Sequence, residues 1–205
     1  MKKASLILST FVFIIFSCTN ESHDIDSAEK KSLFLDIHTF GPGKVTAADV
    51  AKAHQKDLAT ERKYGVRFIQ YWVDEATGKV YCLSEASDSA SVYKTHQEAH
   101  GLVPERILAV SSGEESLPKG NSTLFLDIHE LGPGTVTAKA VAEAHGKDLA
   151  VEGKYGVNFI NYWVDEQSGT IFCLSEAKDA QSVINTHKEA HGLVPVEIHP
   201  VIQGQ

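Results

Sequence analysis

The spacing of hydrophobic and polar positions along residues 33–110 is typical of a small α+β domain. Residues 33–38 alternate aliphatic side chains with Phe34, Asp36 and His38, which predicts a strand with one aliphatic face. Side chains of a strand point to opposite faces in turn. We therefore expect Asp36 and His38 to lie together on the face opposite the aliphatic side chains.

The rest of this segment predicts two helices and three further strands. Thr46, with Asp49 three residues later, resembles a capping box at the start of a helix, and Gly65 suits the end of that helix. The predicted elements are a helix at 47–64, a strand hairpin at 66–75 and 79–86, a helix at 88–100 and a strand at 106–110. This βαββαβ order is that of a ferredoxin-like domain, with both helices on one face of an antiparallel sheet.

The whole pattern occurs a second time 91 residues further along the chain. Leu33–Val110 and Leu124–Val201 align without a gap and are identical at 52 of 78 positions. We expect the open sheet face of each copy to carry aromatic side chains, and such exposed apolar patches usually mark association. These are Phe34, Phe68 and Trp72 in the first copy and Phe125, Phe159 and Trp163 in the second. The predicted fold is therefore α+β: two tandem ferredoxin-like βαββαβ domains packed sheet to sheet as a pseudo-dimeric α+β barrel.

The N-terminal sequence is typical of an export signal. Two lysines precede an apolar stretch at 4–16, which Ser17 and Cys18 follow. The stretch is shorter than the roughly 20 residues of a membrane-spanning helix, and it resembles a bacterial lipoprotein signal, in which the peptide is removed before an acylated cysteine, here Cys18. A plain cleaved signal and an uncleaved anchor are the alternatives.

This interpretation divides the chain into five segments and places the protein in the cell envelope. The segments are a signal peptide at 1–17, lipidated Cys18 with a flexible tether at 18–32, repeat 1 at 33–110, a linker at 111–122 and repeat 2 at 123–202. The tether and the linker are polar, and the linker is rich in serine and glycine. We expect membrane contact through the lipid anchor only, on the periplasmic face or the outer surface of a bacterial membrane.

The charge of the chain argues against nucleic acid as a partner. The formal net charge is −8 at pH 7, and the sequence has no basic stripe that could displace counterions from phosphates. It also has no phosphate-binding loop, nucleophile elbow or dinucleotide fingerprint. We assign no catalytic residue.

Eight of the ten histidines occur as two copies of one pattern. His96 and His100 are four residues apart on a predicted helix, as are His187 and His191, so each pair could bind one metal ion. Residues 96–100 read HQEAH and not HExxH, because the glutamate, Glu98, is at the third position of the segment instead of the second. This disfavours a zinc protease. The alternative is a pair of surface or helix-capping histidines.

Other polar residues of the repeat could join such a site. Asp36 and His38 are close enough on one strand face to share an ion or to orient each other, and Glu85 ends a strand that is apolar on both faces. His54 lies on an apolar helix stripe beside Asp57. It is either a structural residue of the core or a metal ligand whose ring Asp57 orients.

Each repeat also contains one cysteine, Cys82 or Cys173, in equivalent strands. A buried thiol that acts as a small hydrophobic group, an inter-repeat disulfide and a soft metal ligand are the three interpretations. Neither cysteine has the CxxC spacing of a strong metal motif.

Together these residues predict one metal site in each repeat. Imidazole and carboxylate ligands suit nickel, zinc, copper or iron. The candidate ligands are Asp36, His38, Glu85, His96 and His100, and their equivalents Asp127, His129, Glu176, His187 and His191, with His54 and His145 as ligands or structural residues.

Five segments present in both copies carry a resemblance to a known family. They are LFLDIH, YGV, YWVDE, CLSEA and EAHGLVP. With these segments, each repeat resembles, nearly end to end, the domain-of-unknown-function family 4242, ferredoxin-like proteins that include nickel-binding and nickel-responsive members. The resemblance implies a ferredoxin-like fold and metal affinity.

Three functions remain open from the sequence. The first is an exported lipoprotein that binds nickel or a similar divalent ion for sequestration, sensing or delivery rather than turnover. The second is a cofactor-independent monooxygenase or isomerase whose barrel encloses an apolar cavity lined by Tyr71, Trp72 and His38. The third is a structural or protein-binding lipoprotein without a metal.

Overall fold

The computed structural model describes residues 30–113, 116–120 and 122–205. The export signal and the lipid anchor at Cys18 lie outside these residues, so both stay predictions. None of the described helices is both long enough and apolar enough to cross a membrane.

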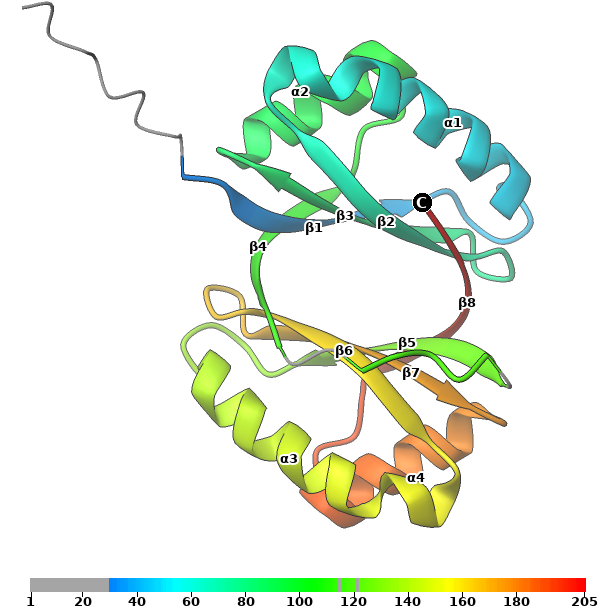
Figure 1. Cartoon of the computed structure of the whole chain (residues 1–205), viewed down its shortest axis with the longest axis vertical. Helices are drawn as coiled ribbons and strands as arrows, with labels where there is room; N and C mark the ends of the chain where they lie inside the picture. The colour runs from blue at the N-terminus through cyan, green and yellow to red at the C-terminus, as the bar shows by residue number, and fades with distance from the viewer. Residues whose placement is uncertain (1–29, 114–115, 121) are drawn as a thin grey trace, which may run out of the picture.

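Each repeat folds in the predicted βαββαβ order (Figure 1). The first contains β1 (Ser32–Thr39), α1 (Ala47–Thr60) with a short 3-10 extension (Glu61–Tyr64), β2 (Arg67–Asp74), β3 (Lys79–Ala86), α2 (Ser89–Ala99) and β4 (Arg106–Ser112). The second contains β5 (Thr123–Glu130), α3 (Ala138–Tyr155), β6 (Asn158–Asp165), β7 (Thr170–Ala177), α4 (Ala180–Ala190) and β8 (Glu197–Gly204).

The ends of α1 form where the sequence predicted them. The Thr46 side chain accepts a hydrogen bond from the Asp49 N–H, and the Asp49 carboxylate accepts one from the Thr46 N–H, so the capping box is complete. The helical segment stops at Gly65, whose φ of 68° is left-handed. These local signals set the length of the element that covers the site.

The eight strands form one closed barrel in the order β1-β3-β2-β8-β5-β7-β6-β4. The last strand of each repeat closes the barrel, because it pairs first with its own repeat and then with the other. β4 pairs with β1 and reaches β6 through Ser111 and Ser112, while β8 pairs with β5 and reaches β2 through 202–204. The predicted linker at 111–122 therefore begins inside a strand. The two helix pairs lie on the outer faces of the barrel (Figure 1).

The barrel interior is filled by side chains from both repeats. Trp72 and Trp163 meet there with their ring centroids 5.0 Å apart. Around them lie aliphatic and aromatic residues of the facing strands, among them Leu35, Ile37, Tyr81, Leu83, Leu126, Ile128, Phe172 and Leu174. This packing argues against an enzyme whose cavity lies inside the barrel, and Tyr71 packs in the outer layer instead.

One part of the predicted interface is wrong. Phe34 and Phe68 pack against Val92 beneath the helices, and Phe125 and Phe159 do the same in the second repeat. The position of Phe34 on the helix side follows from strand alternation, because Phe34 and Asp36 point to the same face of β1. Phe68 is turned outward by an irregularity of register between Phe68 and Gln70, so Phe68 and Trp72 face opposite sides.

Candidate metal centre

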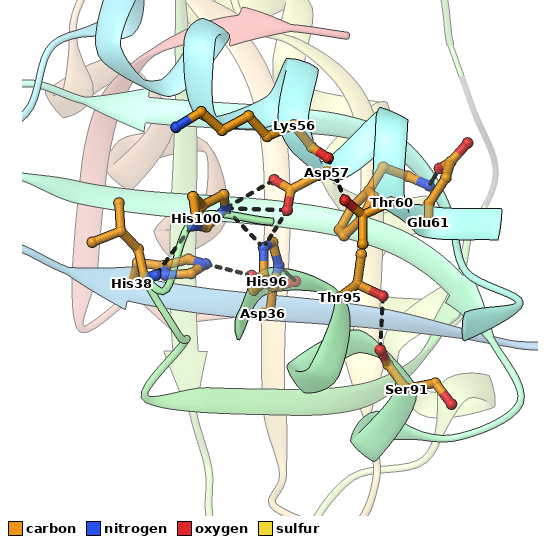
Figure 2. Close-up of polar contacts among 12 residues, drawn as sticks. Asp36, His38, Lys56, Asp57, Thr60, Glu61, Ser91, Thr95, His96 and His100 are labelled. Carbon is orange, nitrogen blue, oxygen red and sulfur yellow. Dashed lines mark hydrogen bonds and ion pairs between the residues drawn. The ribbon is translucent and has the colours of Figure 1, made fainter. Parts of the chain in front are cut away.

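Four elements of the first repeat bring donor groups to one point between the helices and the sheet (Figure 2). Strand β1 supplies Asp36 and His38, β3 supplies Cys82, α1 supplies Asp57, and α2 supplies His96. His100 follows directly at the C-cap of α2. The first five of these side chains are buried.

The first group of donors contains Asp36, His38, Cys82 and His96. One donor atom from each lies within 4.8 Å of the others. His38 Nε2 lies 3.1 Å from Asp36 Oδ1, and His96 Nε2 lies 3.4 Å from Asp36 Oδ2. Two imidazoles, a carboxylate and a thiol therefore meet in a space that one cation could occupy.

The hydrogen bonding of this group fits a cation better than a closed polar network. Asp36 Oδ1 is buried and accepts no hydrogen bond, although the His38 ring nitrogen is close to it. In the second repeat both oxygens of Asp127 and the Nε2 of His187 are buried without a hydrogen bond. Buried polar atoms without partners are costly, and a bound metal ion would satisfy them.

The second group contains Asp57, His96 and His100. The Nδ1 of His96 lies 3.0 Å from Asp57 Oδ1, and His100 Nε2 lies 3.2 Å from Asp57 Oδ2 (Figure 2). His100 Nδ1 accepts a hydrogen bond from the Leu102 N–H, so its Nε2 carries the proton that it donates to Asp57. When His96 likewise donates from Nδ1 to Asp57, its Nε2 is left facing the first group. Such a carboxylate–histidine pair is the usual way to orient a metal-binding imidazole.

The charges of this centre are strongly coupled. Burial disfavours the ionised carboxylate of Asp36, but His96 and His38 outweigh burial and lower its pKa to about 2. Burial also disfavours the imidazolium form of His96, but Asp36 and Asp57 outweigh burial and raise its pKa to about 10. Without a metal, His96 is therefore a cation held between two carboxylates.

Cys82 is protonated in the metal-free centre. Burial and the neighbouring Asp36 raise the pKa of its thiol well above the usual value. The structure gives both Cys82 and Cys173 as free thiols, so the inter-repeat disulfide that was one interpretation of the sequence is not formed. The position of Cys82 agrees with a thiol that could ligate once deprotonated.

The second repeat reproduces this geometry. His129 Nε2 lies 3.1 Å from Asp127 Oδ1, and His187 Nδ1 lies 3.0 Å from Asp148 Oδ1. The equivalent donors Asp127, His129, Cys173 and His187 also lie within 4.8 Å of one another. The barrel therefore carries two related centres.

Two predicted ligands do not reach these centres. Glu85 forms an ion pair with the exposed side chain of Arg67, with 2.8 Å between Glu85 Oε1 and Arg67 Nη2. Glu176 accepts hydrogen bonds from the backbone N–H groups of Lys119 and Gly120. Each carboxylate is the third residue after a cysteine, so alternation places it on the opposite face of its strand from Cys82 or Cys173.

His54 and His145 lie beside the centres but outside both donor groups. The ring of His54 packs 4.8 Å from that of Tyr71 and 5.9 Å from that of Phe68, and burial lowers its pKa. His145 has the same aromatic neighbours in the second repeat. This geometry suits the structural interpretation of these two residues.

Sequence reasoning missed Asp57 and Asp148 as partners of the paired histidines. Asp57 was assigned to His54, three residues before it on α1, yet it contacts His96 and His100 from a different helix. An aspartate on an apolar helix stripe was the available signal, because a buried carboxylate needs a partner.

Comparison with known proteins gives a family match over both repeats. A family model described as "Nickel responsive protein SCO4226-like" matches residues 34–110 and 125–201. No curated protein matches the chain.

Several solved structures are similar to the chain. The crystal structure of SCO4226 from Streptomyces coelicolor A3(2) is 37% identical over 38% of this chain and 94% of its own, with a TM-score of 0.36. A putative monooxygenase from Lactobacillus acidophilus NCFM is 7% identical over 85% of this chain and 94% of its own, with a TM-score of 0.46. A mutant chlorite dismutase from Candidatus Nitrospira defluvii is 8% identical over 85% of this chain and 90% of its own, with a TM-score of 0.45.

Proposed function

The chain belongs to the SCO4226-like family of nickel-responsive proteins, and we propose that each repeat binds one nickel ion or a similar divalent transition metal. Asp36, His38, Cys82 and His96 would hold the ion in the first repeat. Asp127, His129, Cys173 and His187 would hold it in the second. The observation that carries this proposal is the pair of buried donor groups, each with carboxylate oxygens or imidazole nitrogens that lack hydrogen-bond partners.

The donor types agree with nickel. Imidazole nitrogen, carboxylate oxygen and thiolate sulfur together suit nickel, copper and zinc, and the family adds the preference for nickel. A metal would supply positive charge to two buried aspartates that otherwise depend on protonated histidine. Asp57 orients His96, and His100 holds Asp57 from the other side.

Binding without turnover is the role that this arrangement supports. The residues of the proposed sites are almost completely buried, with His96 only 1% and His38 only 5% exposed. Donors buried to this extent suit a protein that holds a metal ion, for sequestration, sensing or delivery. Zinc, copper and iron are the competing occupants, and competition experiments would rank them.

Nickel titration of the full chain tests the proposal directly. By calorimetry, the chelator-treated protein should bind two nickel ions and His96→Ala should bind one. The His96→Ala/His187→Ala double variant should bind nickel no more tightly than free imidazole does. Glu85→Gln is the matched control, because Glu85 lies on the other strand face and pairs with Arg67, and it should bind two ions. Two nickel ions bound to the double variant would contradict the proposal.

We also propose that the protein acts in the cell envelope, on the basis of the signal-like sequence before Cys18. Replacing Cys18 by serine removes the acylation site without touching either repeat. The native chain should fractionate with membranes and should carry a lipid mass at Cys18, whereas Cys18→Ser should be found in the soluble fraction. Membrane association of Cys18→Ser equal to that of the native chain would contradict a lipid anchor.

A further inference from the structure

Three members of each donor group, the two histidines and the cysteine, line a cavity between the helices and the sheet, and the two cavities differ. The cavity of the first repeat has a volume of about 250 Å³ and that of the second about 160 Å³. The imidazoles of His96 and His187 line the two cavities at equivalent positions. The repeats have therefore kept the donors and changed the space above them.

Apolar side chains of the first cavity lie beside four histidines. The apolar residues are Phe40, Val45, Val50, Ala53, Val80 and Leu102, and the histidines are His38, His54, His96 and His100. Drug-sized ligands occupy pockets of about 300–1,000 Å³, whereas an apolar cavity of about 150 Å³ accepts a single benzene ring. The first cavity thus has room for one ring with a small head group, and the second has room for little more than a ring.

The charge at the two mouths also differs. Lys44 lines the first cavity, and Thr135 stands at the equivalent position of the second. Lys44 forms no ion pair with any residue that the structure describes. The Thr135 hydroxyl donates to the Gly132 carbonyl 2.6 Å away, so it is already engaged.

Two carboxylates also line the first cavity, and both are engaged. Asp49 Oδ2 accepts hydrogen bonds from the Thr46 hydroxyl at 2.6 Å and from the Thr46 N–H at 3.2 Å. Asp57 contacts His96 and His100. Lys44 is exposed, and it is the lysine at this cavity that has no carboxylate partner among the described residues.

We infer that the first cavity is a binding site for a small organic carboxylate with an apolar body. The body would lie against the apolar walls, and the carboxylate would pair with Lys44 at the mouth. Such a molecule would cover the imidazole edges that line the cavity and close the first centre from solvent, while the second centre would stay uncovered. The site depends on the cavity and on Lys44, so it does not require that the proposed nickel site is correct.

Benzoate is the probe that tests this inference, with calorimetry on the chelator-treated full chain. One benzoate should bind per chain, and acetate, benzyl alcohol and benzylamine should each bind more weakly because each lacks the ring, the charge or the correct sign. Lys44→Thr should lower the affinity for benzoate about tenfold, as expected for the loss of one charge-assisted hydrogen bond. Thr135→Lys is the matched control in the second repeat and should not lower this affinity.

A second pair of variants locates the ligand. Ala53→Phe fills the first cavity and should abolish benzoate binding, whereas Ala144→Phe fills the second and should leave it unchanged; circular dichroism of both variants confirms that each is folded. The inference is overturned if benzoate and benzylamine bind equally, if Lys44→Thr binds benzoate as tightly as the native chain, or if Ala144→Phe is the variant that loses binding. Because the measurement uses metal-free protein, a failure of nickel binding leaves its result intact.

Discussion

At the residue scale, His96 and its equivalent His187 do most to define the metal centres. Each ring has one nitrogen near the aspartate of its β1 or β5 strand and the other nitrogen near the aspartate of its α1 or α3 helix. A single imidazole thus connects the sheet to the helix layer. The position explains why burial does not make this histidine neutral.

The protonation of His96 and His187 predicts how the stability of the metal-free protein depends on pH. The pKa of each is raised from 6.5 to about 10 by the flanking aspartates, after the opposing effect of burial. A raised folded-state pKa contributes stability that is complete below 6.5 and is lost as the pH rises through about 10. The free energy of unfolding of the chelator-treated chain should therefore fall between pH 7 and pH 10.

Nickel should reverse this trend. Metal ligation needs neutral imidazole, so proton release accompanies binding and the affinity rises with pH. Urea denaturation across this pH range, with and without nickel, measures both slopes. Without nickel, the free energy of unfolding of the His96→Gln/His187→Gln variant should no longer fall between pH 7 and pH 10. An unchanged pH dependence in that variant would assign the effect to other groups.

At the same scale, the lowered pKa of Asp36 limits stability on the acid side. Its folded-state pKa of about 2 lies below the unfolded value of 3.8, after the opposing effect of burial. Its contribution is therefore complete above 3.8 and is lost as the pH falls towards 2. The metal-free centre is most stabilising between these acidic and alkaline limits.

At the scale of elements, the turn between β2 and β3 holds the loop that leads from β1 to α1. The Phe40 N–H donates to the Gly78 carbonyl at 2.8 Å. Gly78 has a φ of +72°, and a Cβ at this position would lie 2.0 Å from the Gly41 carbonyl oxygen. The turn and the loop therefore approach as closely as backbone allows, and this contact sets the position of Phe40 at the cavity.

Gly78→Ala should destabilise the chain far more than Gly65→Ala. Both glycines have left-handed φ values, so each alanine costs about 1–2 kcal/mol of backbone strain, but a Cβ at Gly65 meets nothing within 4 Å. The clash at Gly78 should raise the total cost of Gly78→Ala to about 2–5 kcal/mol. Equal losses in urea denaturation would show that the close approach to Gly41 is relieved at little cost.

At the scale of the whole molecule, the last strands of the two repeats contact the other repeat through chemically different side chains. At the β2–β8 seam, His199 Nδ1 lies 2.8 Å from Asp74 Oδ2 and its Nε2 lies 2.8 Å from Glu197 Oε2, and His199 and Asp74 are both buried. The residue equivalent to His199 in the first repeat is Leu108. Arg106, at the start of β4, instead pairs with Glu130 at the end of β5 on the surface.

His199→Leu should therefore weaken barrel closure more than Arg106→Leu does. Removing the histidine leaves the buried Asp74 with fewer hydrogen-bond partners, at a cost of about 1–3 kcal/mol. Exposed ion pairs such as that of Arg106 contribute about 0–1 kcal/mol. Thermal unfolding of the two variants compares these two contacts between the repeats, and a larger loss of stability in Arg106→Leu would contradict this assignment.

The sequence by itself determined the elements and the duplication of this protein. Alternation at 33–38, the capping box at Thr46 and the terminating Gly65 act between near neighbours, so their signals are visible in a single stretch of chain. The duplication made the barrel predictable as well, because two copies of an open apolar sheet face can cover each other. Asp36, His38, His96 and His100 were identified as candidates for the same reason: residue type and spacing are local properties.

Only the tertiary structure decided which acidic groups and which aromatic side chains meet. Asp57 and His96 are 39 residues apart and come from two helices, so their contact depends on how those helices pack over the sheet. Glu85 and Phe68 show the same limit within strands. One step of alternation turns Glu85 away from the metal centre, whereas one irregularity of register turns Phe68 from the barrel interior to the helix side, where its ring centroid lies 5.0 Å from that of His96. The crossing of β4 and β8 into the other repeat is likewise a property of the closed barrel, since strand pairing satisfies the exposed backbone groups of both sheet edges.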